Sequence, residues 1–274
     1  MILIADSGGT KTDWRFVNSD GTIKQFQSNG FNASTDDIQV LNALIKTVKH
    51  LDIEEVYIYI AGLKSSDLKR NIVQIFEVNF PRLKKIEVEN DLLGAARGLY
   101  NNEEGAVGIL GTGSAGFVFK ENVISNYVPS LGYLMGNEGS GYDLGKHFVA
   151  GLMRNHFSAS TLTRFKESYI WYTEEEMIKR LYTYPQPTFL AQFPKSINQN
   201  LVDPIVWAMV YGRFMVYLNV FFKETKPERI RFSGSIAYNF QDILLEACKD
   251  FGLSCDRIIE SPIAGLTLYH QNHG

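Results

Sequence analysis

The chain begins with an acidic, glycine-rich turn between two strand-like segments, and its residue types suit a nucleotide phosphate. The apolar run 2–6 ends at Asp6, and the turn that follows contains Gly8, Gly9 and Thr10. Because glycine has no Cβ, the amides of this turn can point at phosphate oxygens, and Asp6 would face the metal ion that accompanies them. The turn is not a Walker A loop, because Thr10 precedes Lys11 where a glycine is needed and a strand-like segment follows.

A second turn of the same design lies in the middle of the chain. Gly111, Thr112 and Gly113 separate the apolar strands 106–110 and 115–119, and Thr112 lies 102 positions after Thr10. One such hairpin would be weak evidence, but two at this separation indicate a duplicated domain. We expect the halves to close on one nucleotide from opposite sides.

The pair Asn90-Asp91 is placed to serve the acceptor in phosphoryl transfer. It follows the strand 85–89 and starts the helical stretch 91–101. The amides and dipole of a helix N-terminus favour an ionised carboxylate, so we expect Asp91 to be a base at neutral pH. Such a carboxylate aligns the acceptor hydroxyl and takes its proton late. The alternative is a plain helix cap. The position between the two hairpins favours the catalytic interpretation.

Two further segments suggest ligand contacts. The glycine-rich segment 130–142 includes Gly132, Asn137 and Glu138, and the amide and carboxylate suit sugar hydroxyls. The alternative is a turn with an acidic helix start. Later, Gly234 and Ser235 follow a strand and precede a helix, a shape that lets an adenine ring approach the backbone.

These residues need two mixed sheets covered by helices to bring them together. In the first half we expect strands at 2–6, 13–18, 22–28, 55–60 and 85–89 and helices at 36–50, 66–79 and 91–101. In the second half we expect strands at 106–110, 115–119, 123–128, 229–233 and 256–259, with a helical insert up to about 223. Local signals start helices at Thr173, with a capping box to Glu176, and at Asp203-Pro204 and Ser261-Pro262. A bulky stripe at helical spacing predicts core or a subunit contact; it consists of Trp207, Tyr211, Phe214, Tyr217, Leu218 and Phe221.

Composition excludes several classes of function. The 274 residues carry a formal net charge of −3 and no long basic run, so we do not expect nucleic acid as the partner. Cys248 and Cys255 match no zinc or disulfide framework. We find no apolar run of membrane-span length and no charged leader before Ile2, so a cytoplasmic protein is expected.

Taken in order, these motifs resemble the superfamily of actin, sugar kinases and heat-shock chaperone ATPases. Within it, the chain is most similar to the group of N-acetylglucosamine kinases and benzoyl-CoA reductase activator ATPases. The motifs are Asp6-Ser7-Gly8-Gly9-Thr10-Lys11-Thr12, Asn90-Asp91, Gly111-Thr112-Gly113-Ser114, Gly136-Asn137-Glu138-Gly139-Ser140-Gly141 and Ser233-Gly234-Ser235.

The resemblance implies an α/β fold of two ribonuclease H-like domains with a nucleotide cleft between them. The first would span 1–105, with a last helix at 262–274 packed back on it, and the second 106–261. ATP and Mg²⁺ would be the cofactors, with Asp91 as catalytic base and Asp6 acting on the metal through water. Sugar contacts would come from Asn32, Thr112, Gly132 and Asn137.

Two residues depart from the kinase pattern. Asn137 stands where these kinases usually carry aspartate, and Leu131 where many carry tryptophan, which puts the sugar in doubt. We therefore expect an ATP-dependent kinase acting on an N-acetylated hexosamine or a related sugar, as a homodimer. The alternatives are an activator ATPase that shares an iron-sulfur cluster between subunits, and a nucleotide and sugar sensor without turnover.

Overall fold

A computed structural model gives the structure of the protein and describes residues 1–101 and 103–273. The last position of the expected helix 262–274 thus lies outside the described residues. The chain divides into two compact units. Unit 1 combines Met1–Glu103 with Ser261–Gly274, and unit 2 is the continuous stretch Glu104–Glu260.

Unit 1 is built on a five-stranded sheet in the order β3-β2-β1-β4-β5. The first three strands form an antiparallel meander, whereas β4 and β5 run parallel to β1. The elements of unit 1 are β1 (Ile2–Ser7), β2 (Lys11–Val17), β3 (Ile23–Asn29), α1 (Ile38–Val48), β4 (Glu55–Ile60), α2 (Ser66–Asn79), β5 (Lys85–Asn90), α3 (Asp91–Tyr100) and α13 (Ile263–His273).

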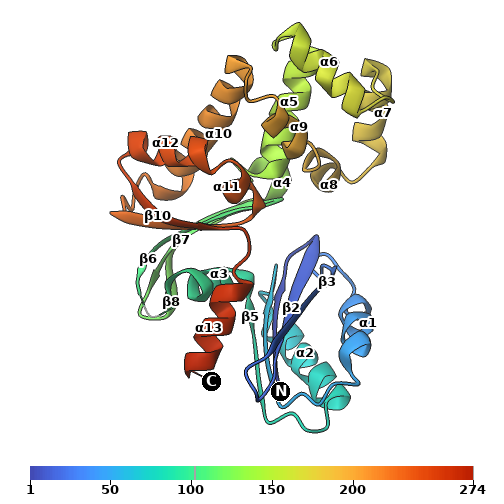
Figure 1. Cartoon of the computed structure of the whole chain (residues 1–274), viewed down its shortest axis with the longest axis vertical. Helices are drawn as coiled ribbons and strands as arrows, with labels where there is room; N and C mark the ends of the chain where they lie inside the picture. Colours follow the sequence, from blue (N-terminus) through green and yellow to red (C-terminus); the bar gives the residue numbers. More distant parts are fainter. Residues whose placement is uncertain (102, 274) are drawn as a thin grey trace. The chain divides into compact units, whose positions relative to one another are not determined.

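Alternation along β1 gives this sheet two buried faces. Leu3 and Ala5 belong to the core that includes side chains of α1 and α2, while Ile4 packs with Ile263 and Leu266 of α13. Figure 1 shows α1 and α2 on one side of the sheet and α3 and α13 on the other. The helix after Ser261 therefore completes the domain that the N-terminal residues begin.

Unit 2 repeats the plan, because its sheet has the order β10-β9-β6-β7-β8 and the same pattern of antiparallel and parallel pairs. The expected α/β class is confirmed. The elements of unit 2 are β6 (Gly105–Leu110), β7 (Ser114–Lys120), β8 (Val123–Val128), α4 (Gly132–Met135), α5 (Gly141–Met153), α6 (Ala159–Ser168), α7 (Glu174–Thr183), α8 (Gln186–Leu190), α9 (Pro194–Gln199), α10 (Pro204–Phe222), β9 (Arg229–Ser233), α11 (Ser235–Asn239), α12 (Gln241–Phe251) and β10 (Ser254–Ile259).

The helix starts expected in the insert are found, with one correction. Asp203 caps α10 by accepting from the Ile205 amide at 3.0 Å, and Thr173 caps α7 by accepting from the Glu176 amide at 3.1 Å. The expected capping box is wrong, because the Glu176 carboxylate turns along the helix and accepts from Arg180 Nε at 2.8 Å. The pair one turn away wins over the backbone amide.

Helix α10 is the central core element of unit 2. Phe214, Tyr217, Leu218 and Phe221 are buried, which confirms the predicted stripe, and Trp207 and Tyr211 are partly buried against the same core. Contrary to our expectation from sequence, α10 is long and apolar enough, by length and composition, to cross a membrane, the only such helix in the described part of the chain. Its buried aromatic side chains identify it as a core helix.

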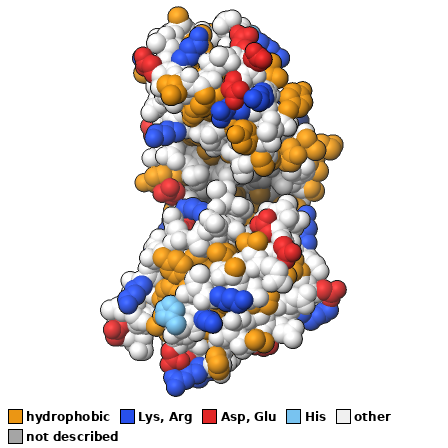
Figure 2. Space-filling view, turned by 90° about the vertical axis from the view of Figure 1, so that its right-hand side faces the viewer, with side chains coloured by type: hydrophobic (Ala, Val, Ile, Leu, Met, Phe, Trp, Pro, Cys, Tyr) orange, Lys and Arg blue, Asp and Glu red, His pale blue; other side chains and the backbone are white. Residues whose placement is uncertain are grey.

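On the face shown in Figure 2, Lys and Arg are interspersed with Asp and Glu.

Candidate active site

The parallel strands of unit 1 bring three of the predicted site residues to one edge of the sheet. Ser7 pairs in register with Ile60 of β4, and Ile60 with Asn90 of β5, so the carboxyl ends of the three strands coincide. Asp6 and Asp91 therefore lie at this edge. Asn32 joins them through an isolated parallel bridge to Ala61, directly after β4. This is the edge at which open α/β sheets bind ligands.

The carboxylates at this edge repel one another. Burial, followed by the charges of Asp91 and Asp13, raises the pKa of Asp6 to about 8, although Lys11 opposes this shift. Lys11 Nζ lies 3.3 Å from Asp13 Oδ2. Because neighbouring negative charges disfavour the ionised form of Asp6, this edge of the sheet is suited to a cation.

Asp91 is the first residue of α3, and Asn90 is the cap, since its Oδ1 accepts from the Leu93 amide at 2.8 Å. Burial raises the pKa of Asp91 to about 6 and outweighs the hydrogen bonds of its own amide and that of Leu92. The amides at the helix terminus favour the ionised form, as expected, but desolvation is the larger effect on this carboxyl. At pH 7 the group is still mostly ionised, roughly nine-tenths for a pKa one unit lower.

The first glycine-rich turn is stabilised by hydrogen bonds among its own and adjacent residues. The Gly8 amide donates to the Lys11 carbonyl at 3.0 Å, so Gly8 shapes the turn. Thr12 is buried, and its hydroxyl bonds with Ser7 Oγ at 2.7 Å and the Asn29 carbonyl at 3.2 Å. Gly9 and Thr10 remain exposed at the tip, and a Cβ on Gly9 would lie 3.7 Å from Asn32 Nδ2.

The second turn lies at the corresponding edge of unit 2. The Gly111 amide donates to the Gly113 carbonyl at 3.0 Å, and the Gly111 carbonyl accepts from the Gly141 amide at 2.8 Å. Gly234 adopts φ +121°, and a Cβ there would lie 2.3 Å from the Leu110 carbonyl oxygen. Only glycine fits this approach, so the turn 111–113, the start of α5 and Gly234 meet at one place.

Ser114, Ser235, Thr112 and Glu138 lie around this meeting point in different environments. Ser114 is buried, and its Oγ has no hydrogen-bond partner among the described residues. Ser235 is exposed at the first position of α11, while Thr112 and Glu138 are partly exposed. The Thr112 carbonyl accepts from the Tyr142 amide at 3.3 Å.

The glycine-rich segment contains a one-turn helix, α4, that we did not predict from the sequence. Gly132 and Asn137 adopt positive φ angles of 70° and 63°. The Asn137 amide donates to the Ser130 carbonyl at 3.3 Å, which closes the segment on itself. A Cβ on Gly113 would lie 3.2 Å from Asn137 Oδ1, so this side chain lies against the second turn.

Sequence reasoning missed two residues next to this segment. Asp143 in α5 is buried and accepts from the Gly139 amide at 2.9 Å and from Arg213 Nε of α10 at 2.7 Å. The pair is 70 positions apart, so no local pattern connects it. The one available signal was that Arg213 is the single charged residue of α10.

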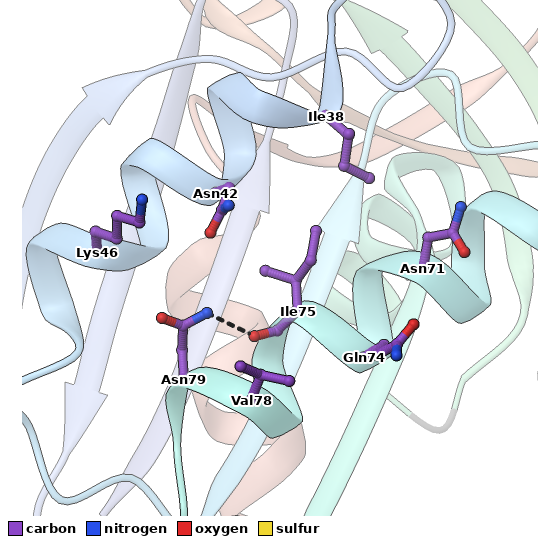
Figure 3. Close-up of a pocket in the computed structure, with 8 residues that line it drawn as sticks. All are labelled: Ile38, Asn42, Lys46, Asn71, Gln74, Ile75, Val78 and Asn79. Carbon is purple, nitrogen blue, oxygen red and sulfur yellow. Dashed lines mark hydrogen bonds between the residues drawn. The ribbon is translucent and has the colours of Figure 1, made fainter.

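One groove of unit 1 lies away from the predicted site residues. A groove of about 490 Å³ separates α1 from α2, and Figure 3 shows its amide side chains, with Asn79 donating to the Ile75 carbonyl at 2.8 Å. None of the predicted site residues lines it, and its lining contains no carboxylate. We do not assign it to the site. Its lining consists of Ile38, Asn42, Lys46, Asn71, Gln74, Ile75, Val78 and Asn79.

Comparison with solved structures identifies the family. Family models and curated protein sequences give no match. The chain is similar to the candidate N-acetylglucosamine kinase of Porphyromonas gingivalis, with 32% identity, 99% of each chain covered and a TM-score of 0.92. The candidate N-acetylglucosamine kinase of Chromobacterium violaceum shares the fold, with 19% identity, 98% of each chain covered and a TM-score of 0.76.

A more distant match is the ROK family glucokinase of Streptomyces griseus in complex with glucose and AMPPNP. It is 16% identical over 98% of this chain and 99% of that one, with a TM-score of 0.58, and shows the fold alone. The similarity to the Porphyromonas protein goes further, because it combines high identity with full coverage of both chains. The chain therefore belongs to the N-acetylglucosamine kinase-like family, a group of ATP-dependent carbohydrate kinases within the actin-like ATPase superfamily.

Proposed function

We propose that the protein transfers the γ-phosphoryl group of ATP to a hydroxyl of an N-acetylated hexosamine, such as N-acetylglucosamine or a related sugar. The observation that carries this proposal is the edge of unit 1, where Asp6, Asn32 and Asp91 meet at the carboxyl ends of parallel strands. An amide, a carboxylate with a pKa of about 6 and a second carboxylate are the groups that hydroxyl phosphorylation requires.

Asp91 is the proposed catalytic base. Its pKa of about 6 leaves the carboxylate mostly ionised at pH 7, and this pKa is closer to pH 7 than that of an exposed aspartate. The carboxylate would accept a hydrogen bond from the sugar hydroxyl and receive its proton as the bond to phosphorus forms. General bases act best with a pKa near the working pH.

The residues at this edge fit Mg²⁺ bound largely through water and phosphate. No group of three or more His, Cys, Asp or Glu that could hold a metal ion occurs among the described residues. The magnesium of kinases usually takes only one or two carboxylates. Asp6 would hold the ion through water, and the ion would neutralise charge on the phosphates. Asp6 carries the raised pKa that a nearby cation would relieve.

The two turns are the proposed phosphate contacts. The contacting residues would be Gly8, Gly9, Thr10, Lys11 and Thr12 of unit 1 and Gly111, Thr112, Gly113 and Ser114 of unit 2. Within these sets, Gly8 and Thr12 support the turn through their internal hydrogen bonds. The buried, unpartnered Ser114 hydroxyl supports a polar ligand at the second turn. Gly234 and Ser235 would approach the adenine.

Asn32, Asn90, Thr112, Gly132, Asn137 and Glu138 are the proposed sugar contacts, together with Asp91. Asn137 brings an amide rather than a carboxylate against Gly113, so it can both donate to and accept from a hydroxyl. This change favours a sugar that differs from the usual substrate at one hydroxyl. It also keeps a sensor without turnover as an alternative outcome.

An activator ATPase has less support. Cys248 is buried in α12 and Cys255 is partly buried in β10, and burial raises the pKa of both thiols, that of Cys255 to about 11. Protonated, buried thiols are poor cluster ligands. Neither cysteine lies at the edges described above.

The test is a coupled assay for ADP release with ATP, Mg²⁺ and a panel of N-acetylated and free hexoses. We expect one N-acetylated hexosamine to raise ADP release far above background and Asp91→Asn to abolish the increase without weakening ATP binding. Tight sugar binding without ADP would establish the sensor instead. Equal ADP release with and without every sugar would refute the kinase.

A homodimer in the cytoplasm also stays a prediction. Ile205, Val216 and Val220 of α10 are exposed at 51%, 37% and 40%, which is unusual for an apolar helix face without a partner. Light scattering on the purified protein measures the mass directly. A single 31.0 kDa species at all concentrations would exclude the dimer.

A further inference from the structure

We propose that the ion pair between Asp143 and Arg213 is a positioning device that fixes the segment 136–140 in its sugar-binding conformation. This inference rests on the proposed function, since it concerns the residues that would hold the sugar. It assigns a role to two residues outside the set of proposed sugar contacts.

Asp143 is almost completely buried, and both of its carboxylate oxygens have polar partners. It is 3% exposed, and its Oδ2 accepts from both the Gly139 amide and Arg213 Nε, while His147 Nδ1 lies 3.3 Å from Oδ1. Burial raises the pKa of Asp143, but the bonds from His147 and Arg213 outweigh it and hold the pKa below the ordinary value. The carboxylate is thus charged and ties α10 to the backbone of the segment.

Gly139 is the residue of the segment 136–140 to which the Asp143–Arg213 ion pair is bound, through the Gly139 amide. It has a φ of +70°, and a Cβ there would lie 3.0 Å from Tyr217 Cβ and 3.5 Å from the Arg213 carbonyl oxygen. Gly139 therefore lies directly against α10. Asn137, two residues earlier, also has a positive φ, 63°. Both residues thus adopt the left-handed region, which glycine enters freely and asparagine tolerates, so the shape of the segment depends on these two residue types.

The same helix holds the second turn. Tyr217 is buried, and its hydroxyl donates to the Ala115 carbonyl at 2.7 Å, one residue into the strand that follows the turn. Arg213 and Tyr217 are one helical turn apart. One face of α10 thus sets both the turn proposed to hold phosphate and the segment proposed to hold the sugar.

A buried ion pair is a poor source of stability, because desolvating two charges offsets their attraction. Arg213 is the single charged residue among the 19 of α10, and an apolar residue there would suit the core. The pair is better explained by the conformation that it enforces. A segment that is correct only part of the time binds its ligand more weakly by that fraction.

The experiment compares Asp143→Ala with Asp203→Ala in the full-length protein. Asp203 is a matched control, a buried carboxylate of unit 2 that accepts from the Ser158 and Ile205 amides and the Thr161 hydroxyl, with no bond to the segment. Both changes remove a buried carboxylate. Hydrogen exchange at the Gly139 amide and the KM values for sugar and ATP are measured for each.

We expect Asp143→Ala to raise the sugar KM about tenfold or more, with the KM for ATP nearly unchanged, and to speed exchange at Gly139. Asp203→Ala should do neither. Arg213→Met should reproduce the effect of Asp143→Ala, and Arg213→Lys should restore part of it. If Asp143→Ala does not fold, Arg213→Met carries the same test.

The two failures are distinct. A wild-type protein that releases no ADP with any sugar contradicts the kinase, whatever the variants do. An active wild type whose sugar KM responds equally to Asp143→Ala and Asp203→Ala overturns the positioning role. Unchanged exchange at Gly139 in Asp143→Ala would also overturn it, independently of any activity.

Discussion

Replacing Asp91 with asparagine should make the protein more stable and inactive at once. Folding raises the pKa of Asp91 from about 4 in an unfolded chain to about 6. Between these values the folded state holds more protons than the unfolded state, so stability falls as the pH rises through this interval. Asparagine carries no charge and escapes this loss.

The size of the effect follows from the shift. Two pKa units correspond to about 3 kcal/mol, and because Asp91 is only partly enclosed we expect about 1 to 3 kcal/mol above pH 6.5. Near pH 4 the two proteins should be equally stable, since the wild-type carboxyl is protonated in the fold. Loss of the base should lower kcat by about 10² to 10⁴.

The measurement is urea unfolding of both proteins at pH 4.5 and 8, without Mg²⁺, together with ADP release at pH 7.5. Omitting the cation keeps the repulsion between Asp6 and Asp91 in place. A variant that is less stable than the wild type at pH 8, or equally stabilised at both pH values, would refute the assigned pKa. A variant that retains its kcat would refute the assigned role.

Two backbone contacts give further predictions. Gly234→Ala should destabilise unit 2 by about 2 kcal/mol or more and weaken ATP binding in calorimetry, because its Cβ would lie 2.3 Å from the Leu110 carbonyl oxygen. Gly212→Ala is the control, since a Cβ at this position meets nothing within 4 Å. This substitution should stabilise α10 by up to about 1 kcal/mol, because alanine has the higher helix propensity. Gly265→Ala should lower the melting temperature of unit 1, because its Cβ would lie 1.9 Å from the Gly98 carbonyl oxygen. Normal melting of that variant would show that α13 does not pack on α3 as described.

Local signals predicted most of the elements. Alternation and turns placed the strands of both sheets within a few residues, and Asp203 was found at the helix start that its type and the following proline indicated. Capping is a matter of neighbouring residues, so sequence can show it. The predicted capping box at Glu176 was wrong because Arg180 binds the same carboxylate. A sequence pattern does not show which of two competing hydrogen bonds is the stronger.

The site was predictable where it repeats a motif and unpredictable where it depends on enclosure. The two turns and Asp91 could be recognised from residue types, but the raised pKa of Asp91 comes from surroundings built by distant strands. Asp143 and Arg213 meet only because α5 and α10 pack together. The sequence around Asp143 and the sequence around Arg213 contain no signal that predicts this contact.

The position of α13 in the chain also determines the order in which the protein can be completed during synthesis. Unit 2 is continuous, so it can fold as soon as Glu260 leaves the ribosome. The sheet of unit 1 is made before unit 2, but the helix carrying Ile263 and Leu266 emerges only after unit 2. Until then, the face of that sheet on which α13 packs is covered by α3 alone. The apolar side chains that pack against α13, such as Ile4, therefore wait for their last partners until unit 2 has been made.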